Sequence, residues 1–202
     1  MWPDLISTDQ SGFMAGRFIG ENIRQVYDIM KYTELNDIPD LLLLIDFEKA
    51  FDSVSHNFIF KTPDLLKFGD SFKRWIKVFY NHVQSSVLVN GHMTPLLKIK
   101  SGCRQGDGLS PYIFLLCSQV LNIAINNNDN IKGIKIDNST KSCNMPMILP
   151  FFLDGTENSL SATLKLLDDF HKISGLKVNI DKTNAVWIGS KKVMRFYAKT
   201  TK

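Results

Sequence analysis

The sequence predicts a mixed α+β fold in a single domain. Segments with apolar residues at helical spacing alternate along the chain with short apolar runs that are typical of strands. An Asn-Gly pair between two such short segments indicates a β-hairpin. Two further apolar runs, 41–45 and 147–153, lie far apart in the sequence and each leads directly to an aspartate, which indicates buried strands.

The composition excludes several classes of protein. The chain has 202 residues, of which 44% are hydrophobic and 22% charged, so it can bury a core and is not disordered. Its 3 cysteines form no CxxC pattern, which excludes a disulfide framework or a zinc ribbon and favours a reducing compartment. No apolar run approaches the roughly 20 residues of a membrane span, and the N-terminus has no signal-peptide or transit-peptide pattern. We therefore expect an intracellular location, in the nucleus or cytoplasm, without membrane contact; no pattern indicates an oligomeric state.

The first elements are a helix and a strand. Apolar residues recur at helical spacing over 18–32, which predicts a helix, and a proline-containing turn follows at 36–40. The run 41–45 is short, continuously apolar and bounded by turns. It predicts a buried strand that ends at Asp46.

Two helices and a hairpin follow. Helices are expected at 55–68 and 71–82, because a Gly-Asp-Ser sequence between them supplies a C-cap and then an N-cap. The segments 86–89 and 96–99 flank the Asn-Gly pair and predict the two strands of the hairpin.

The second half starts with a polar, glycine-rich loop at 101–110. A proline at the favoured first position of a helix then predicts a helix over 111–126. Strands are expected at 131–136 and at 147–153, the latter ending at Asp154.

The last elements are a helix and two short strands. An amphipathic helix is expected at 161–173, closed by a glycine C-cap, with strands at 176–180 and 184–188. Residues 165–202 contain nine Lys or Arg and three Asp, so their net charge is +6, whereas the net charge of the whole chain is +4. A basic C-terminal tail over 190–202 is compatible with a polyanionic partner, although the charge alone favours a solvated, partly frayed C-terminus.

The two strand-end aspartates, Asp46 and Asp154, are the candidate site residues. A carboxylate at the end of a buried strand must be paired, exposed or metal-bound, because burying it alone costs several kcal/mol. Two carboxylates from adjacent strands suit Mg²⁺, which binds one or two carboxylates together with substrate phosphates. The alternative is that each Asp forms a turn at its strand end.

Five motifs follow one another in a familiar order. They are an Asp followed by Lys-Ala-Phe-Asp (46–52), Val-Asn-Gly (89–91), an Arg-Gln-Gly loop (104–111), Phe-Leu-Asp-Gly-Thr (152–156), and Ser-Gly-Leu-Lys-Val-Asn followed by Lys-Thr (174–183). Together with the segment 9–24, they resemble the reverse transcriptase domain of non-LTR retrotransposons, the long interspersed elements. The resemblance covers about 9–189.

The resemblance implies a polymerase palm with partial fingers, a small antiparallel sheet backed by helices. It implies that Asp46 and Asp154 are catalytic and, with Phe47, hold two Mg²⁺ ions, with Mn²⁺ as a possible substitute, for two-metal nucleotidyl transfer. The partners that it implies are an RNA template, a DNA primer and deoxynucleotides.

The same resemblance assigns the nucleotide site. Phe51 would be the steric gate that excludes a ribose 2′-hydroxyl, although it also fits a core aromatic. Gln105 and Gly106 would lie along the incoming nucleotide and template. Lys182 would stand near the leaving pyrophosphate, and a solvated turn lysine explains it equally well.

The sequence also departs from the family pattern. Gly155 stands where the family has the second Asp of the catalytic pair, and the domain, 1–189, is expected to be incomplete at both ends. We therefore expect a truncated, partly degraded copy whose polymerase activity is doubtful. Two alternatives stay open: a non-enzymatic remnant with weak nucleic-acid binding, and another Mg²⁺ enzyme that uses two carboxylates.

Overall fold

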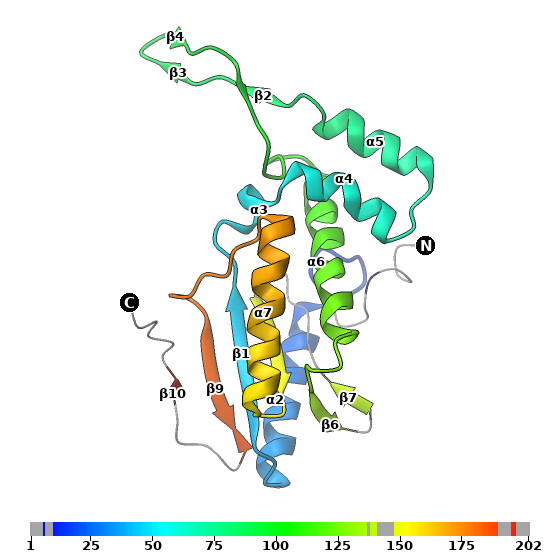
Figure 1. The fold of residues 1–202 in the computed structure, drawn as a ribbon, viewed down its shortest axis with the longest axis vertical. Coiled ribbons are helices and arrows are strands. Elements are labelled where there is room, and N and C mark those ends of the chain that lie inside the picture. The colour runs from blue at the N-terminus through cyan, green and yellow to red at the C-terminus, as the bar shows by residue number, and fades with distance from the viewer. Residues whose placement is uncertain (1–5, 7–9, 137, 141–147, 190–194, 197–202) are drawn as a thin grey trace.

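A four-stranded antiparallel sheet forms the centre of the molecule (Figure 1). A computed structural model describes residues 6, 10–136, 138–140, 148–189 and 195–196. The strands of the sheet, in spatial order, are β10 (Arg195–Phe196), β9 (Asn184–Ile188), β1 (Asp40–Asp46) and β8 (Ile148–Leu153). Each strand runs antiparallel to its neighbours, so the predicted α+β fold is confirmed.

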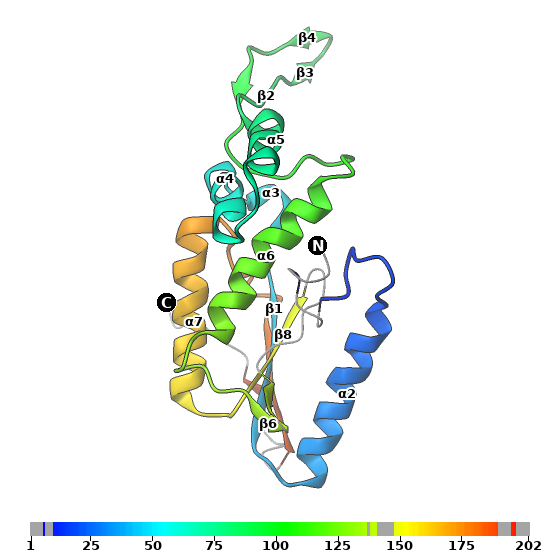
Figure 2. The same ribbon diagram turned by 90° about the vertical axis from the view of Figure 1, so that its right-hand side faces the viewer.

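The leucine-rich strand β1 is buried on both faces. Leu41, Leu43 and Ile45 pack into the main core, whereas Leu42 and Leu44 belong to a second cluster on the other face. The period of two along a strand explains this division, and a continuous apolar run is typical of a strand covered on both sides. The flanking helices are α2 (Ile19–Leu35) on one side of the sheet, and α6 (Ser110–Asn126) and α7 (Glu157–Ser174) on the other (Figure 2).

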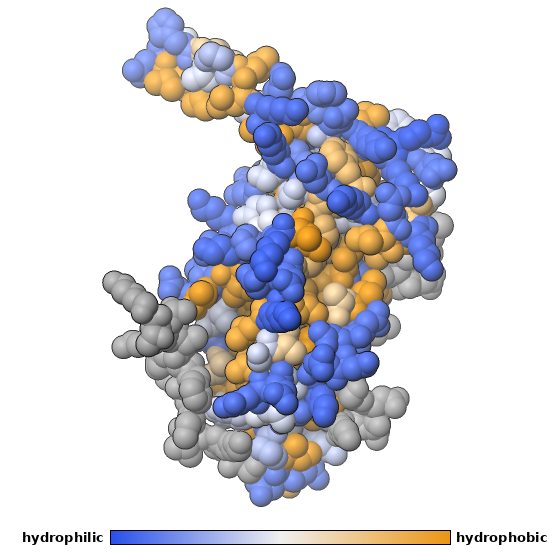
Figure 3. Space-filling model, viewed as in Figure 1, coloured by the Kyte–Doolittle hydropathy of each residue, from blue (hydrophilic) through white to orange (hydrophobic). Residues whose placement is uncertain are grey.

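A long hairpin projects from the helices α3 (Ala50–Ser53), α4 (His56–Leu65) and α5 (Asp70–Tyr80) (Figure 1). It pairs β2 (Gln84–Ser85) with β5 (Leu97–Lys98), and β3 (Leu88–Val89) with β4 (His92–Met93). Asn90 and Gly91 form its tip with positive φ angles of 49° and 82°, as the Asn-Gly pair predicts. Figure 3 shows apolar side chains along this arm, where Leu88 and Met93 are 65% and 68% exposed.

Several elements differ from the sequence prediction, among them the predicted hairpin strands 86–89 and 96–99, which do not pair with each other because the first pairs with β4 and the second with β2. The segment 176–180 is not a strand; it makes one isolated bridge, between Val178 and Phe47, because the chain then turns at Asn179, whose carbonyl accepts the Thr183 N–H (2.9 Å). Helix α7 begins earlier than predicted, at Glu157, because the Thr156 hydroxyl caps it by accepting the Ser159 N–H.

Other differences concern short strands. The strand predicted at 131–136 is confirmed only over β6 (Ile134–Ile136), which pairs with the unpredicted β7 (Asn138–Thr140). The basic tail predicted at 190–202 lies mostly outside the described residues, but Arg195–Phe196 within it form β10. No helix in the described ranges is both long enough and apolar enough to cross a membrane.

Gly155 is required by the backbone where the chain leaves β8. Its φ of +72° lies in the left-handed region, which side chains other than glycine seldom adopt. A Cβ added at Gly155 would lie 2.8 Å from Cζ3 of Trp187 and 3.6 Å from the Pro39 carbonyl oxygen. Glycine at this position is therefore explained by local packing.

Asp40, at the start of β1, is a buried carboxylate at the same end of the sheet. It has 0% exposure, and its Oδ1 accepts the Leu41 N–H at 2.9 Å, while Oδ2 has no hydrogen-bond partner among the described residues. Burial, together with a smaller effect of the nearby Asp154 charge, raises the pKa of Asp40 to about 7, although the hydrogen bond from Leu41 N–H lowers it. Asp40 is therefore protonated over much of the acidic range in the folded state.

We expect Gly155→Ala to destabilise the chain more than Gly106→Ala does. Both glycines have left-handed φ angles, +72° and +81°, so both variants incur about 1–2 kcal/mol of backbone strain. Only Gly155 also has a neighbouring ring, since nothing lies within 4 Å of a Cβ at Gly106. Urea denaturation of both variants measures the difference, and equal losses would show that Trp187 does not restrict this turn.

We expect the free energy of unfolding to fall as the pH rises from about 4 to about 7. An unfolded Asp ionises near its ordinary pKa of 3.8, whereas the folded-state pKa of Asp40 is about 7, so the folded state binds more protons between these values. The Asp40→Asn variant has no carboxyl group at this position. Its free energy of unfolding should therefore lack the decrease, on the order of 4 kcal/mol, that ionisation of Asp40 causes in the parent. Denaturation midpoints across this pH range test the effect; parallel curves for parent and variant would show that Asp40 is already ionised when folded.

Candidate functional site

Three separate segments meet where β1 ends at Asp46. Backbone hydrogen bonds join the segment after β1 to the glycine-rich loop on one side and to the segment after α7 on the other. These bonds run from Cys103 N–H to Phe51 O (2.7 Å), Gly102 N–H to Val54 O (2.8 Å), Glu48 N–H to Lys177 O (2.8 Å), Asn179 N–H to Asp46 O (2.8 Å) and Ser55 N–H to Ser174 O (2.7 Å). The backbone therefore gathers three of the motifs singled out in the sequence.

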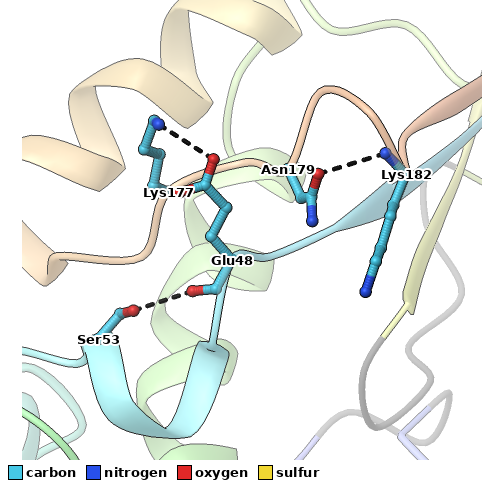
Figure 4. A network of polar contacts seen from close by, with 5 residues as sticks. All are labelled: Glu48, Ser53, Lys177, Asn179 and Lys182. Atoms are coloured by element: carbon cyan, nitrogen blue, oxygen red, sulfur yellow. Dashed lines mark hydrogen bonds and ion pairs between the residues drawn. The ribbon is translucent and has the colours of Figure 1, made fainter.

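Asp46 has a lysine beside it. Its side chain is 22% exposed, and Oδ2 lies 4.0 Å from Nζ of Lys182. Lys182 is held by a turn in which its N–H donates to Oδ1 of Asn179 at 3.3 Å (Figure 4). The Asp46 N–H donates to the Thr183 hydroxyl at 3.5 Å. The structure thus brings together two of the predicted site residues, Asp46 and Lys182.

Sequence reasoning missed a second polar contact between the same segments. Lys177 Nζ lies 3.0 Å from Oε1 of Glu48, whose carbonyl accepts the Ser53 hydroxyl at 2.9 Å (Figure 4). Both charged groups are about half exposed, so the pair contributes at most about 1 kcal/mol. The sequence shows an acidic residue in the motif 46–52 and a basic residue in the motif 174–183. It does not show that they pair, because the pairing depends on the backbone bridge between Phe47 and Val178.

Phe51 is part of the core as well as of the site. Its ring stacks on Phe114 with centroids 4.5 Å apart and an interplanar angle of 26°, and meets Phe13 edge-on at 6.3 Å. Such pairs contribute beyond the area that they bury. The core role that the sequence left open for Phe51 is confirmed, and its role as a steric gate stays a prediction.

Gln105 and Gly106 lie in the exposed loop beside Phe51. Nε2 of Gln105 donates to Oδ1 of Asp52 at 3.0 Å, which fixes the loop against the helix that carries Phe51. Gly106 has a φ of +81° and no neighbour within 4 Å of an added Cβ, so the loop is open to a ligand at this point. This Gln105–Asp52 contact was not predicted.

Asp154 lies at the other end of the sheet. β8 is antiparallel to β1, so Leu153 pairs with Leu41 and Ile148 pairs with Asp46. A strand rises about 3.4 Å per residue, so the two ends of β1 are roughly 20 Å apart. The prediction that Asp46 and Asp154 jointly hold two Mg²⁺ ions is therefore wrong, as is the interpretation of Gly155 as the lost neighbour of that pair.

Asp154 instead organises the turn before α7. Its Oδ1 accepts the Thr156 N–H at 3.1 Å and the Thr156 hydroxyl at 2.7 Å. Partial burial raises the pKa of Asp154, but the hydrogen bonds from Thr156 and Ser159 outweigh it and leave the pKa below its ordinary value. The alternative that the sequence left open, a turn-forming aspartate at a strand end, describes Asp154.

The described residues do not fit the expected pair of Mg²⁺ ions. Phe47, the third expected ligand, could bind an ion only through its backbone carbonyl oxygen, because its side chain carries no ligand atom and lies in the core. No group of three or more His, Cys, Asp and Glu side chains in the described ranges is placed to hold a metal ion. Asp46 alone, with an ammonium group as its neighbour, supplies too little negative charge for two divalent cations.

Comparison with known proteins identifies the family. Residues 1–197 match the family described as reverse transcriptase (RNA-dependent DNA polymerase). The transposon TX1 uncharacterized 149 kDa protein of Xenopus laevis is 31% identical over 113 residues, 56% of this chain and 9% of that protein. The Pol polyprotein of the type-2 retrotransposable element R2DM of Drosophila melanogaster is 27% identical over 180 residues, 89% of this chain and 17% of that protein. The chain thus spans less than a fifth of the length of these relatives.

Solved structures with the same fold include telomerases. Apo telomerase of Candida tropicalis, truncated from its C-terminal domain, superimposes with a TM-score of 0.54 at 13% identity, over 81% of this chain and 35% of that one. The same enzyme with a fragment of telomeric RNA gives a TM-score of 0.59 at 13% identity, over 81% of this chain and 29% of that one. These similarities confirm the predicted polymerase palm fold.

The family match covers nearly the whole chain, and the relatives are polyproteins of non-LTR retrotransposons. The chain therefore belongs to the reverse transcriptase (RNA-dependent DNA polymerase) family.

Proposed function

We propose that this chain binds an RNA template paired with a DNA primer but does not add nucleotides to the primer. The observation that carries this proposal is the pairing of β1 with β8, which sets Asp154 roughly 20 Å from Asp46. The family generally uses divalent metal ions, and two-metal sites hold their ions about 4 Å apart between shared ligands. In this proposal, residues 1–189 form one domain, the palm with partial fingers, and residues 190–202 form a basic tail.

Binding is supported by the side chains around Asp46. Lys177, Lys182, Arg104 and Gln105 are exposed, and all lie on the three segments that meet there. Lys and Arg contacts to phosphates supply most of the sequence-independent affinity for nucleic acid. In the proposed complex the open loop at Gly106 follows the template, and the Phe51 ring lies against the sugar of the last base pair.

The absence of transfer is supported by electrostatics. When several carboxylates act together in catalysis, removal of any one of them lowers the rate by several orders of magnitude. Asp46 has Lys182 at 4.0 Å, so its charge is already partly balanced. A different Mg²⁺ enzyme built on two carboxylates would need the same missing pair, so the geometry does not favour that alternative either.

We expect a fluorescently labelled RNA–DNA template–primer to bind the chain with an affinity that falls steeply with salt. Replacing Lys177 and Lys182 together by Ala should weaken binding and reduce the slope of log affinity against log salt by about two. The double variant Lys31→Ala and Lys165→Ala, at exposed positions of α2 and α7, removes the same number of charges and is the matched control, which should leave the slope unchanged. Equal effects of the two variants would place the binding surface elsewhere.

We expect no primer extension by the unsubstituted chain with deoxynucleotides and either Mg²⁺ or Mn²⁺. The assay uses the same template–primer, at a protein concentration that the binding experiment shows to be saturating. Extension that disappears in Asp46→Ala would contradict the proposal, because it would show that the end of β1 supports catalysis as it stands.

A further inference from the structure

The residue paired with Asp46 across the sheet is Ile148. The two strands are antiparallel and in continuous register from Leu41–Leu153 to Asp46–Ile148. Residues paired in this way carry their side chains on one face of the sheet, with Cβ atoms about 5 Å apart. Position 148 is therefore the register position of β8 opposite Asp46.

A carboxylate at position 148 would be placed to share a cation with Asp46. Two carboxylates on paired strand positions can approach one ion from two sides, and Mg²⁺ or Mn²⁺ needs only one or two protein carboxylates besides water. The Asp46 side chain is 22% exposed, so the ion can enter from solvent. Isoleucine has no atom that can serve this purpose.

Gly155 offers no such position. It follows β8 at the Asp40 end of the sheet, and its surroundings there are Trp187 and Pro39. An aspartate at position 155 would add charge next to Asp154 and near the buried carboxylate of Asp40, which already interacts with Asp154. Asp46 would be unaffected by it.

We propose that position 148, and not 155, is where this chain lacks the carboxylate that would complete a divalent-cation site with Asp46. The inference rests on the proposed function, because it names the missing group behind the absence of transfer. It predicts that one substitution, Ile148→Asp, creates a cation site.

The test is Mn²⁺ binding to the purified chain, measured by electron paramagnetic resonance without nucleic acid or nucleotide. Ile148→Asp should bind Mn²⁺ at least about tenfold more tightly than the parent, since affinity follows the number of ligand charges. Ile148→Asn controls for polarity without charge, and Gly155→Asp controls for charge at the other end; neither should gain affinity. The gain should vanish when Asp46→Asn is combined with Ile148→Asp.

A second measurement tests the register alone and does not depend on the stability of the charged variant. Cysteines in the double variant Asp46→Cys and Ile148→Cys should form a disulfide on mild oxidation, since paired strand residues have the Cα separation that disulfides require. Cysteines at Asp46 and Asp154 should not cross-link. Peptide mass spectrometry distinguishes these links from any that involve the native cysteines.

Each contrary result overturns the inference. It is wrong if folded Ile148→Asp gains no Mn²⁺ affinity, if the gain persists without Asp46, or if the 46–154 pair cross-links while 46–148 does not. Failure of the proposed function would show differently, as primer extension by the unsubstituted chain.

Discussion

The antiparallel pairing of β1 with its neighbours is the constraint on which the rest of the molecule depends. β1 pairs with β9 along one edge and with β8 along the other, and its side chains pack into a separate apolar cluster on each face of the sheet. Its register fixes which residues of β8 and β9 lie at each end of the sheet. A shift of one residue in the register of β1 would turn Leu42 and Leu44 away from the second cluster and toward the main core. Side-chain packing therefore holds the register in place.

The two ends of β1 have opposite character as a result. At one end Asp46 is partly exposed beside Lys182, in a site assembled from distant segments by backbone hydrogen bonds. At the other end Asp40 is buried and its pKa is raised to about 7, while Asp154 and Gly155 shape the turn into α7. The family likeness concerns the whole fold, and the loop at Gly106, beside the first end, is open to a ligand.

Most elements were predictable because local patterns determine them. The apolar run before Asp46, the Asn-Gly hairpin tip and the proline at the start of α6 each specify their structure within a few residues. The partner of Asp46 was not predictable in this way, because it depends on strand order and direction. Two neighbouring strands that each end in Asp bring those residues together only if they are parallel, and β8 is antiparallel.

The wide separation in sequence between paired strands affects how the chain folds. Leu41 pairs with Leu153 and also with Trp187, so the central strand emerges from the ribosome long before either of its partners. Until then its leucines and unpaired backbone groups stay open to other chains, a state that slows folding and promotes aggregation. We expect newly made chains to depend on chaperones at this stage, with the hairpin and the helices between the strands already formed.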